Sequence, residues 1–204
     1  MATTTRHVAL LRRNAAVFQL VFATFWFVRL VLAWGSPEAW AVAIGGTTAA
    51  TIGTRRAWRS AAGLRAREEF RTPAGRAFLR PVTVISTVQL VGSIVLPWVA
   101  STTGHTEWVV PSIAITIGLF LMAFATPLQV PAVRWAGAVA TLVPATLPYV
   151  VSGDALVAAV AATLGAALTA SVWWCAVADP VDPPNDVGTA SEPGQLHTAF
   201  TCEP

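Results

Sequence analysis

The chain has 204 residues, of which 55% are hydrophobic and only 11% are charged, and its formal net charge is +3. Soluble domains carry about 25% charged residues, so this composition excludes an ordinary soluble protein and predicts an integral membrane protein. All thirteen lysine or arginine positions are arginines, and most of them cluster beside apolar runs, which is typical of topology signals in membrane proteins rather than of nucleic-acid binding.

Six apolar runs of helical length predict six transmembrane helices. A polar lead of residues 1–13 precedes them, and a basic loop at 55–80 interrupts them. The predicted spans, in chain order, cover residues 14–34, 39–54, 81–100, 108–127, 135–151 and 155–178. We therefore expect an all-α, polytopic membrane helix bundle.

Two of the predicted spans carry stripes of small residues. In the second span Gly45, Ala49 and Gly53 recur every four residues, and the sixth span has an alanine stripe at 158, 162, 166 and 170. Small side chains let membrane helices approach closely, so we expect both stripes to be buried against neighbouring helices.

The loop at 55–80 contains eight arginines interleaved with apolar residues such as Trp58 and Phe70. One interpretation is an interfacial amphipathic helix that ends near Pro73 and contacts anionic headgroups, at about 1 kcal/mol per arginine. The other interpretation, which we favour, is a cytoplasmic loop whose charge fixes the topology. No recognised nucleic-acid-binding motif is present, so we expect no nucleic-acid partner.

The arginines orient a six-span protein in its membrane. Twelve of them lie outside the predicted spans, and with six spans all twelve fall on one face. The positive-inside rule makes that face cytoplasmic, so we predict a protein of the cytoplasmic membrane with both termini inside. After Asp179-Pro180 the chain becomes polar, and residues 179–204 are predicted to be a disordered cytoplasmic tail.

Arg29 is the one arginine inside a predicted span. A charge at membrane depth costs roughly 2.5–3.5 kcal/mol on insertion scales, so it normally has a partner or a function. We hypothesise an outward-facing polar pocket in which Arg29 pairs with Glu38, Glu107 or Asp154, or binds an anionic group. The alternative is that the Arg29 side chain extends to the outer headgroups and has a structural role only.

Other polar and helix-breaking residues follow the same outer half of the predicted bundle. Pro144 and Pro148 each remove a helical hydrogen bond in the fifth span, and Tyr149 lies beside them. Irregular backbone at membrane depth is tolerated only inside protein or beside water. We therefore count Tyr149, together with Arg29, among the candidate ligand-binding residues.

Two glutamines, Gln19 and Gln89, are the other large polar side chains inside the predicted spans. Their usual role is an interhelical hydrogen bond worth roughly 0.6 kcal/mol, and the alternative is contact with a substrate. We include Gln89 among the candidate ligand-binding residues. Hydroxyl groups such as those of Ser86 and Thr116 can bond to their own helix backbone and need no further role.

Absent motifs narrow the function classes. The chain has no His-Glu-x-x-His, no Walker loop, no Gly-x-Ser-x-Gly and no aspartate-rich diphosphate motif. Its three histidines lie outside the predicted spans, so we expect no metal site and no cofactor.

Two functional hypotheses remain. The leading one is a non-enzymatic membrane protein that binds or passes a small or lipophilic molecule through the outward-facing pocket, with self-association as a further expectation. The alternative is a small membrane enzyme that acts on a lipid or isoprenoid as a cyclase or isomerase. Glu38 or Asp154 would then be the general acid, with Glu107 as a further candidate and a pKa raised by a low-dielectric setting. Because such an acid must face an enclosed apolar pocket, its exposure separates the two hypotheses.

A resemblance covers residues 107–137. The stretch from Glu107 reads Glu-Trp-Val-Val-Pro-Ser-Ile-Ala-Ile-Thr-Ile-Gly-Leu-Phe-Leu-Met-Ala-Phe-Ala, and Val130-Pro131 and Ala136-Gly137 follow. It resembles a group of small multi-pass bacterial membrane proteins that share a Pro-x-Ile-Ala-x-x-x-Gly-Leu span, a short Val-Pro turn and a following span with glycine. The resemblance implies a multi-span fold and no particular activity.

Overall fold

The computed structural model describes residues 3–178, with side chains described from residue 5 onward. This part of the chain is all-helical and contains no β-strand. Its elements are α1 (Thr3–Trp34), α2 (Pro37–Ser60), α3 (Ala66–Glu69), α4 (Pro73–Thr102), the 3₁₀ helix η1 (Thr106–Trp108), α5 (Val109–Leu128), α6 (Val133–Thr146), the 3₁₀ helix η2 (Leu147–Tyr149) and α7 (Gly153–Val177). The predicted tail at 179–204 lies outside the described residues.

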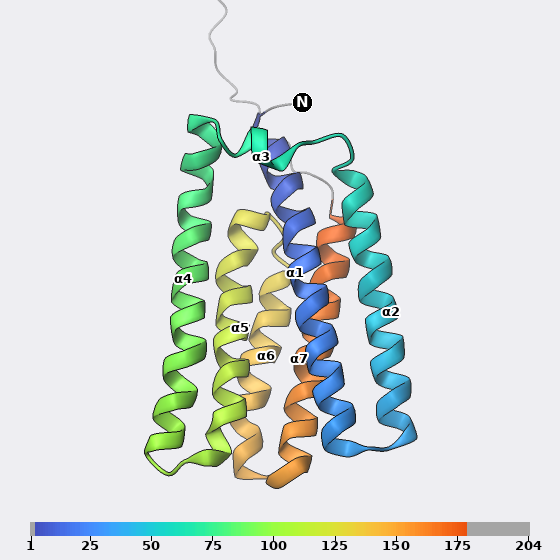
Figure 1. Ribbon diagram of the computed structural model, residues 1–204, viewed down its shortest axis with the longest axis vertical. Helices are drawn as coiled ribbons and strands as arrows, with labels where there is room; N and C mark the ends of the chain where they lie inside the picture. Colours follow the sequence, from blue (N-terminus) through green and yellow to red (C-terminus); the bar gives the residue numbers. More distant parts are fainter. Residues whose placement is uncertain (1–2, 179–204) are drawn as a thin grey trace, which may run out of the picture.

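Six of these helices lie side by side, and the short α3 crosses one end of the bundle (Figure 1). The central helix α1 packs against α7 and α2, while α5 packs against α6 on one side and α4 on the other. Four of the described helices, α1, α4, α5 and α7, are long and apolar enough to cross a membrane. The chain is therefore a multi-pass, membrane-embedded helical protein.

The remaining two long elements are less apolar or shorter than a typical span. α2 has Glu38 in its first turn and three arginines in its last two turns, and α6 has only 14 residues. A typical transmembrane helix needs about 20 predominantly apolar residues, with a range of about 17–25. Length and composition therefore identify four candidate membrane spans. Crossings by α2 and α6 must be argued from how these two helices pack against the other four.

The basic segment at 55–80 is neither one continuous amphipathic helix nor a plain loop. α2 continues to Ser60, α3 follows, and α4 begins at Pro73. The prediction that Pro73 ends a helix is wrong, because this proline occupies the first turn of α4, where its missing N–H costs nothing. Thr72 caps the same helix, since its Oγ1 accepts a hydrogen bond from the Gly75 N–H over 3.0 Å.

The prediction of irregular backbone near Pro144 and Pro148 is confirmed. The α-helical part of this span ends at Thr146, two residues after Pro144. The chain then tightens into η2, which contains Pro148 and ends at Tyr149. The break follows from the two missing backbone N–H groups.

The small-residue stripes are only partly buried. In α2 the buried positions include Ala43, Ala50, Gly53 and Ala57, whereas Gly45 is exposed and has no atom within 4 Å of where its Cβ would be. The prediction of a buried Gly45 is therefore wrong, since a spacing of three and four residues follows a helix face more closely than a spacing of four alone.

In α7 the predicted alanine stripe is also incomplete. Ala158 is buried, but Ala166 is exposed. Large residues such as Leu164 and Val172 are fully buried beside the small ones. The reason is that α7 packs against α1, α2 and α6, so burial extends around most of its circumference.

Glycines allow the closest helix contacts. A Cβ added to Gly118 of α5 would lie 2.7 Å from the Gly137 carbonyl oxygen of α6, and one added to Gly137 would lie 2.6 Å from that of Gly118. These two helices thus meet backbone to backbone. The ring of Phe27 similarly fills the space above Gly46 of α2 and Gly165 of α7.

Candidate ligand cleft between α1, α4 and α5

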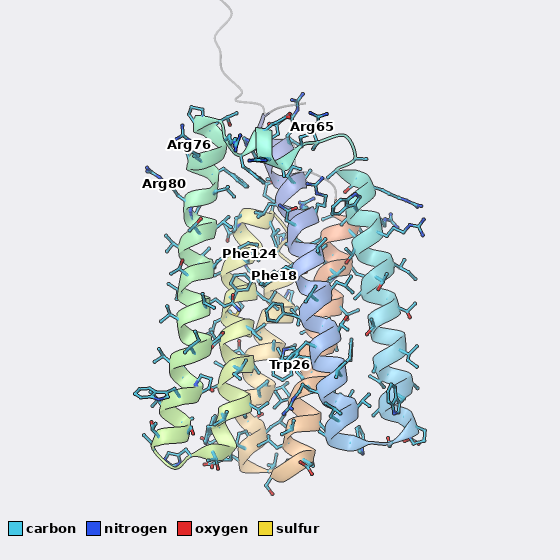
Figure 2. All side chains as sticks on the ribbon, in the orientation of Figure 1. Phe18, Trp26, Arg65, Arg76, Arg80 and Phe124 are labelled. Atoms are coloured by element: carbon cyan, nitrogen blue, oxygen red, sulfur yellow. The ribbon has the colours of Figure 1, made fainter. Side chains whose placement is uncertain are left out.

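The two ends of the bundle differ in charge. One end, which we call the arginine end, is formed by the start of α1, the end of α2, α3, the start of α4, the α5–α6 turn and the end of α7. Arg65, Arg76 and Arg80 lie at this end in Figure 2. Every arginine of the chain except Arg29 lies in these segments, in the connections on either side of α3, or in the first turn of α6.

The residues predicted to form an outward-facing pocket lie near the opposite end, and among the described residues no hydrogen bond or ion pair joins Arg29 to the candidate acids or to Tyr149. Arg29 is on an exposed face of α1, and no described carboxylate forms an ion pair with it. Tyr149 is 78% exposed, and its ring packs edge-on against Trp108. The ligand-binding roles of Arg29 and Tyr149 therefore stay predictions without support from the geometry.

The three candidate acids are also exposed. Glu38, Glu107 and Asp154 each lie at the surface of the same end. The pKa of Glu38 is below its ordinary value, because the Ser36 side chain and then the Glu38 backbone N–H bond to the carboxylate. A general acid in an apolar pocket needs the opposite shift, so this geometry gives the enzyme hypothesis no support.

A cavity near that end is apolar. It has a volume of about 380 Å³, lies between α1 and α2, and is lined by residues that include Phe27, Val31 and Trp40. Neither Arg29 nor any other charged residue lines it. This cavity is therefore not the predicted polar pocket, which stays a prediction.

A buried arginine that the sequence did not single out holds the arginine end together. Arg12 is 4% exposed, and its guanidinium donates to the carbonyl oxygens of Leu128, Gln129 and Ala178 at distances of 2.8, 3.1 and 2.8 Å. Leu128 and Gln129 end α5, and Ala178 follows α7. The cation therefore satisfies the unpaired carbonyls, and the negative dipole ends, of two helices at once.

The start of α4 is fastened to α1 at the same end. The buried ring of His7 stacks between Phe70 and Phe78, with centroids 5.8 and 5.5 Å away. Its Nε2 lies 3.4 Å from the Glu69 carbonyl oxygen. These contacts bring α4 to α1 at the arginine end.

Further along, α4 packs along α5 and separates from α1. It is the outlying helix of the bundle, as its position at the edge of Figure 1 shows. Only 6% of the most apolar stretch of α4 is buried, against 50% for that of α5. The separation leaves a cleft between the three helices.

The cleft has a volume of about 390 Å³, within the range of small-molecule sites. Its lining residues are Leu11, Asn14, Ala15, Phe18 and Gln19 of α1, Ser86, Gln89 and Leu90 of α4, and Phe120 and Phe124 of α5. Phe18 and Leu90 are 53% and 62% exposed, so the cleft opens sideways at the surface of the bundle. In Figure 2, Phe18 and Phe124 lie near one another at about mid-height.

Aromatic rings form the walls of this cleft. Phe120 and Phe124 stack with centroids 4.7 Å apart along α5, and Phe18 packs against Phe22 at the same separation along α1. Gln89 and Phe120 also line a second cavity of about 400 Å³ between α4 and α5. The apolar part of the site thus suits a hydrocarbon chain or ring.

The polar side chains of the cleft have no partners. Gln19 is 3% exposed, yet its Oε1 is fully buried without a hydrogen bond. Within the described residues, Asn14, Ser86 and Gln89 have no side-chain hydrogen bond either. The predicted interhelical bonds of Gln19 and Gln89 are absent here, although both side chains line a small void of about 10 Å³ beside the cleft.

Buried side-chain atoms without a partner also occur outside the cleft, in Thr5, Arg13, Trp26, Ser93 and Ser171, whereas many hydroxyl groups within the helices are bonded. Thr83, Thr116, Thr141, Thr163 and Thr169 donate to the carbonyl four residues earlier in their own helices, as predicted. Ser86 was expected to do the same and does not. Because an unpartnered buried amide costs roughly 1–3 kcal/mol, the cleft retains polar groups that its own fold does not satisfy.

The sequence contained part of the signal for this site. Gln19 and Gln89 were noted as polar groups at membrane depth, and Gln89 was a candidate ligand-binding residue. Their convergence on Phe18, Phe120 and Phe124 could not be read from the chain, because it depends on α4 parting from α1.

Comparison with protein-family models, curated proteins and solved structures gives no match for this chain. The resemblance of residues 107–137 therefore stays an expectation. The predicted anionic-lipid contacts of the 55–80 arginines and the predicted self-association also stay predictions.

Proposed function

We propose that the chain crosses the cytoplasmic membrane six times, through α1, α2, α4, α5, α6 with η2, and α7, with the arginine end in the cytoplasm. In support, α2 packs along α1 and α7, and α6 packs along α5 and α7. A bilayer that covers the four apolar helices would therefore cover these two as well. The positive-inside rule then gives the orientation.

Labelling of single cysteines tests this topology. With Cys175 and Cys202 replaced by serine, Ala62→Cys reports on the arginine end and Thr103→Cys on the opposite end. Six crossings with the N-terminus inside predict that a membrane-impermeant maleimide labels only Thr103→Cys in intact cells. If only α1, α4, α5 and α7 cross, the two positions exchange sides and only Ala62→Cys is labelled.

We further propose that the protein binds a lipophilic molecule in the cleft between α1, α4 and α5, entered sideways from the bilayer. The observation that carries this proposal is the unpartnered, 3%-exposed Gln19 amide at the wall of an aromatic cleft. Ligand sites are typically apolar cavities with a few placed polar groups, and this one has that composition. The site differs from the predicted outward-facing pocket, since it lies at about mid-height of the bundle and not at the Arg29 end.

Photo-cross-linking locates the occupant. The full chain would be placed in nanodiscs with two probes that carry a diazirine in one acyl chain, a diacylglycerol and a phosphatidic acid. Peptide mapping should place the adducts of at least one probe within 11–19, 86–90 and 120–124. Adducts of both probes spread evenly over the exposed faces of α2 and α4 would overturn the proposal.

A further inference from the structure

We infer that the ligand of the cleft is a neutral lipid alcohol, whose hydroxyl binds Gln19 and Gln89 while its hydrocarbon part leaves between α1 and α4. This inference rests on the proposed function, and it adds the chemical class of the ligand. It follows from the charge of the lining, the chemistry of its polar groups and the place where the cleft opens.

The lining contains no charged residue. The nearest buried cation along α1, Arg12, donates to three carbonyl groups at the arginine end. An ionised phosphate, carboxylate or ammonium would therefore lose its hydration in the cleft without gaining an opposite charge, which is strongly unfavourable. This excludes phospholipids and fatty acids as head-first ligands of the cleft.

The polar groups of the lining are amides and one hydroxyl. An amide presents both an acceptor oxygen and an NH₂ donor, and rotation about its terminal torsion exchanges the two. A hydroxyl group both donates and accepts, so it satisfies the Gln19 amide in either orientation and still reaches a second partner. A ketone, quinone or ester carbonyl only accepts and leaves the Gln19 Oε1 unpaired, and a hydrocarbon satisfies neither group.

The geometry also orients the ligand. Gln19 is buried and Gln89 half-buried, whereas Phe18 and Leu90 at the mouth are largely exposed. A hydroxyl at the amides therefore places the rest of the molecule against the rings of Phe120 and Phe124 and out toward the lipid. Diacylglycerols and isoprenoid alcohols both have this shape and chemistry.

Competition among matched lipids tests the head group. The diazirine diacylglycerol would be cross-linked to the full chain in nanodiscs while one unlabelled competitor is added. Dioleoylglycerol should reduce cleft labelling, whereas its acetylated derivative and dioleoyl phosphatidic acid should compete about tenfold less well. A long-chain isoprenoid alcohol is the fourth competitor. Whether it or dioleoylglycerol reduces the labelling more strongly identifies the class of alcohol that the cleft prefers.

Variants of the two glutamines test whether their amides bind the hydroxyl of the ligand. Gln19→Leu keeps the size of the side chain and removes the amide, so it should weaken dioleoylglycerol competition about three- to tenfold, as loss of one buried hydrogen bond would. Gln89→Leu should act in the same direction and serves if Gln19→Leu does not fold. Thr163→Val is the control, since the Thr163 hydroxyl bonds to its own helix and does not line the cleft.

The two proposals fail in different ways. If cleft labelling occurs but dioleoylglycerol and its acetylated derivative compete equally, or if phosphatidic acid competes best, the lipid-alcohol inference is wrong and the cleft is still a lipid site. If neither Gln19→Leu nor Gln89→Leu changes the competition by dioleoylglycerol, the lipid-alcohol inference is likewise wrong and the cleft is still a lipid site. If neither probe labels the cleft, the proposed function itself is wrong.

Discussion

Two buried polar side chains on α1, about two helical turns apart, have opposite surroundings. Arg12 is 4% exposed and donates to three carbonyl groups, whereas Gln19 is 3% exposed and its Oε1 has no partner. The first group completes the ends of α5 and α7. The second lines a cleft that α4 leaves open. The comparison shows that two equally buried polar side chains on one helix can differ in whether the fold satisfies their hydrogen bonds, and that only Gln19 of the two is left free to bind a ligand.

The largest loss of stability is expected on replacing Arg12, whose hydrogen bonds are satisfied. Arg12→Leu leaves three carbonyl groups without their charged donor and should lower the free energy of unfolding by about 3–5 kcal/mol. Thermal unfolding in mild detergent, followed by size-exclusion chromatography, measures this loss. Arg12→Lys keeps the charge but not the planar fork of donors, so it should recover only part of the stability. Full stability of Arg12→Leu would show that the carbonyl contacts are dispensable.

The glycine contact between α5 and α6 should give the next largest loss. Gly118→Leu places side-chain atoms against the Gly137 backbone, which cannot move aside, and should cost about 1–3 kcal/mol or more. Gly45→Leu is the matched control, because nothing lies within 4 Å of that position. The same detergent assay compares them, and equal losses for the two variants would contradict the close approach of α5 and α6.

Replacing Gln19, whose amide has no partner, should affect stability in the opposite direction from replacing Arg12. Gln19→Leu removes a buried amide that has no partner, so the unliganded protein should keep its stability or gain about 1 kcal/mol. The same variant should lose affinity for the cleft ligand. A stability loss of the size expected for Arg12→Leu would mean that Gln19 has a structural partner, and the contrast between the two residues would disappear.

Arg29 should show the smallest effect. Because its side chain is exposed and forms no ion pair with the described residues, Arg29→Leu should change the unfolding free energy by no more than about 0.5 kcal/mol. Cleft labelling should also be unchanged. Loss of labelling would restore the hypothesis of a pocket organised by Arg29.

The sequence predicted the helical class and the membrane setting well. Apolar runs and flanking arginines are local signals, and Pro144 and Pro148 gave the irregular end of α6 for the same reason. The failures concern contacts between helices. Gly45 points away from the bundle because the orientation of α2 depends on its neighbours, and Pro73 begins a helix because Thr72 caps it.

The candidate site was harder to predict than the fold. Arg29 drew attention because a charge in an apolar run is conspicuous, whereas Arg12, in the polar lead, looked like an ordinary topology signal. Which of them is buried depends on where α5 and α7 end. Gln19 and Gln89 were visible as polar groups, but the absence of partners around them is a three-dimensional property.

A structure of the full chain in nanodiscs made from native membrane lipids tests the central claim most directly. We predict elongated density in the cleft between α1, α4 and α5, with a polar end within hydrogen-bonding distance of the Gln19 amide, while Arg12 keeps its three carbonyl contacts. An empty cleft with α4 closed against α1 and the Gln19 amide bonded within the protein would contradict the account.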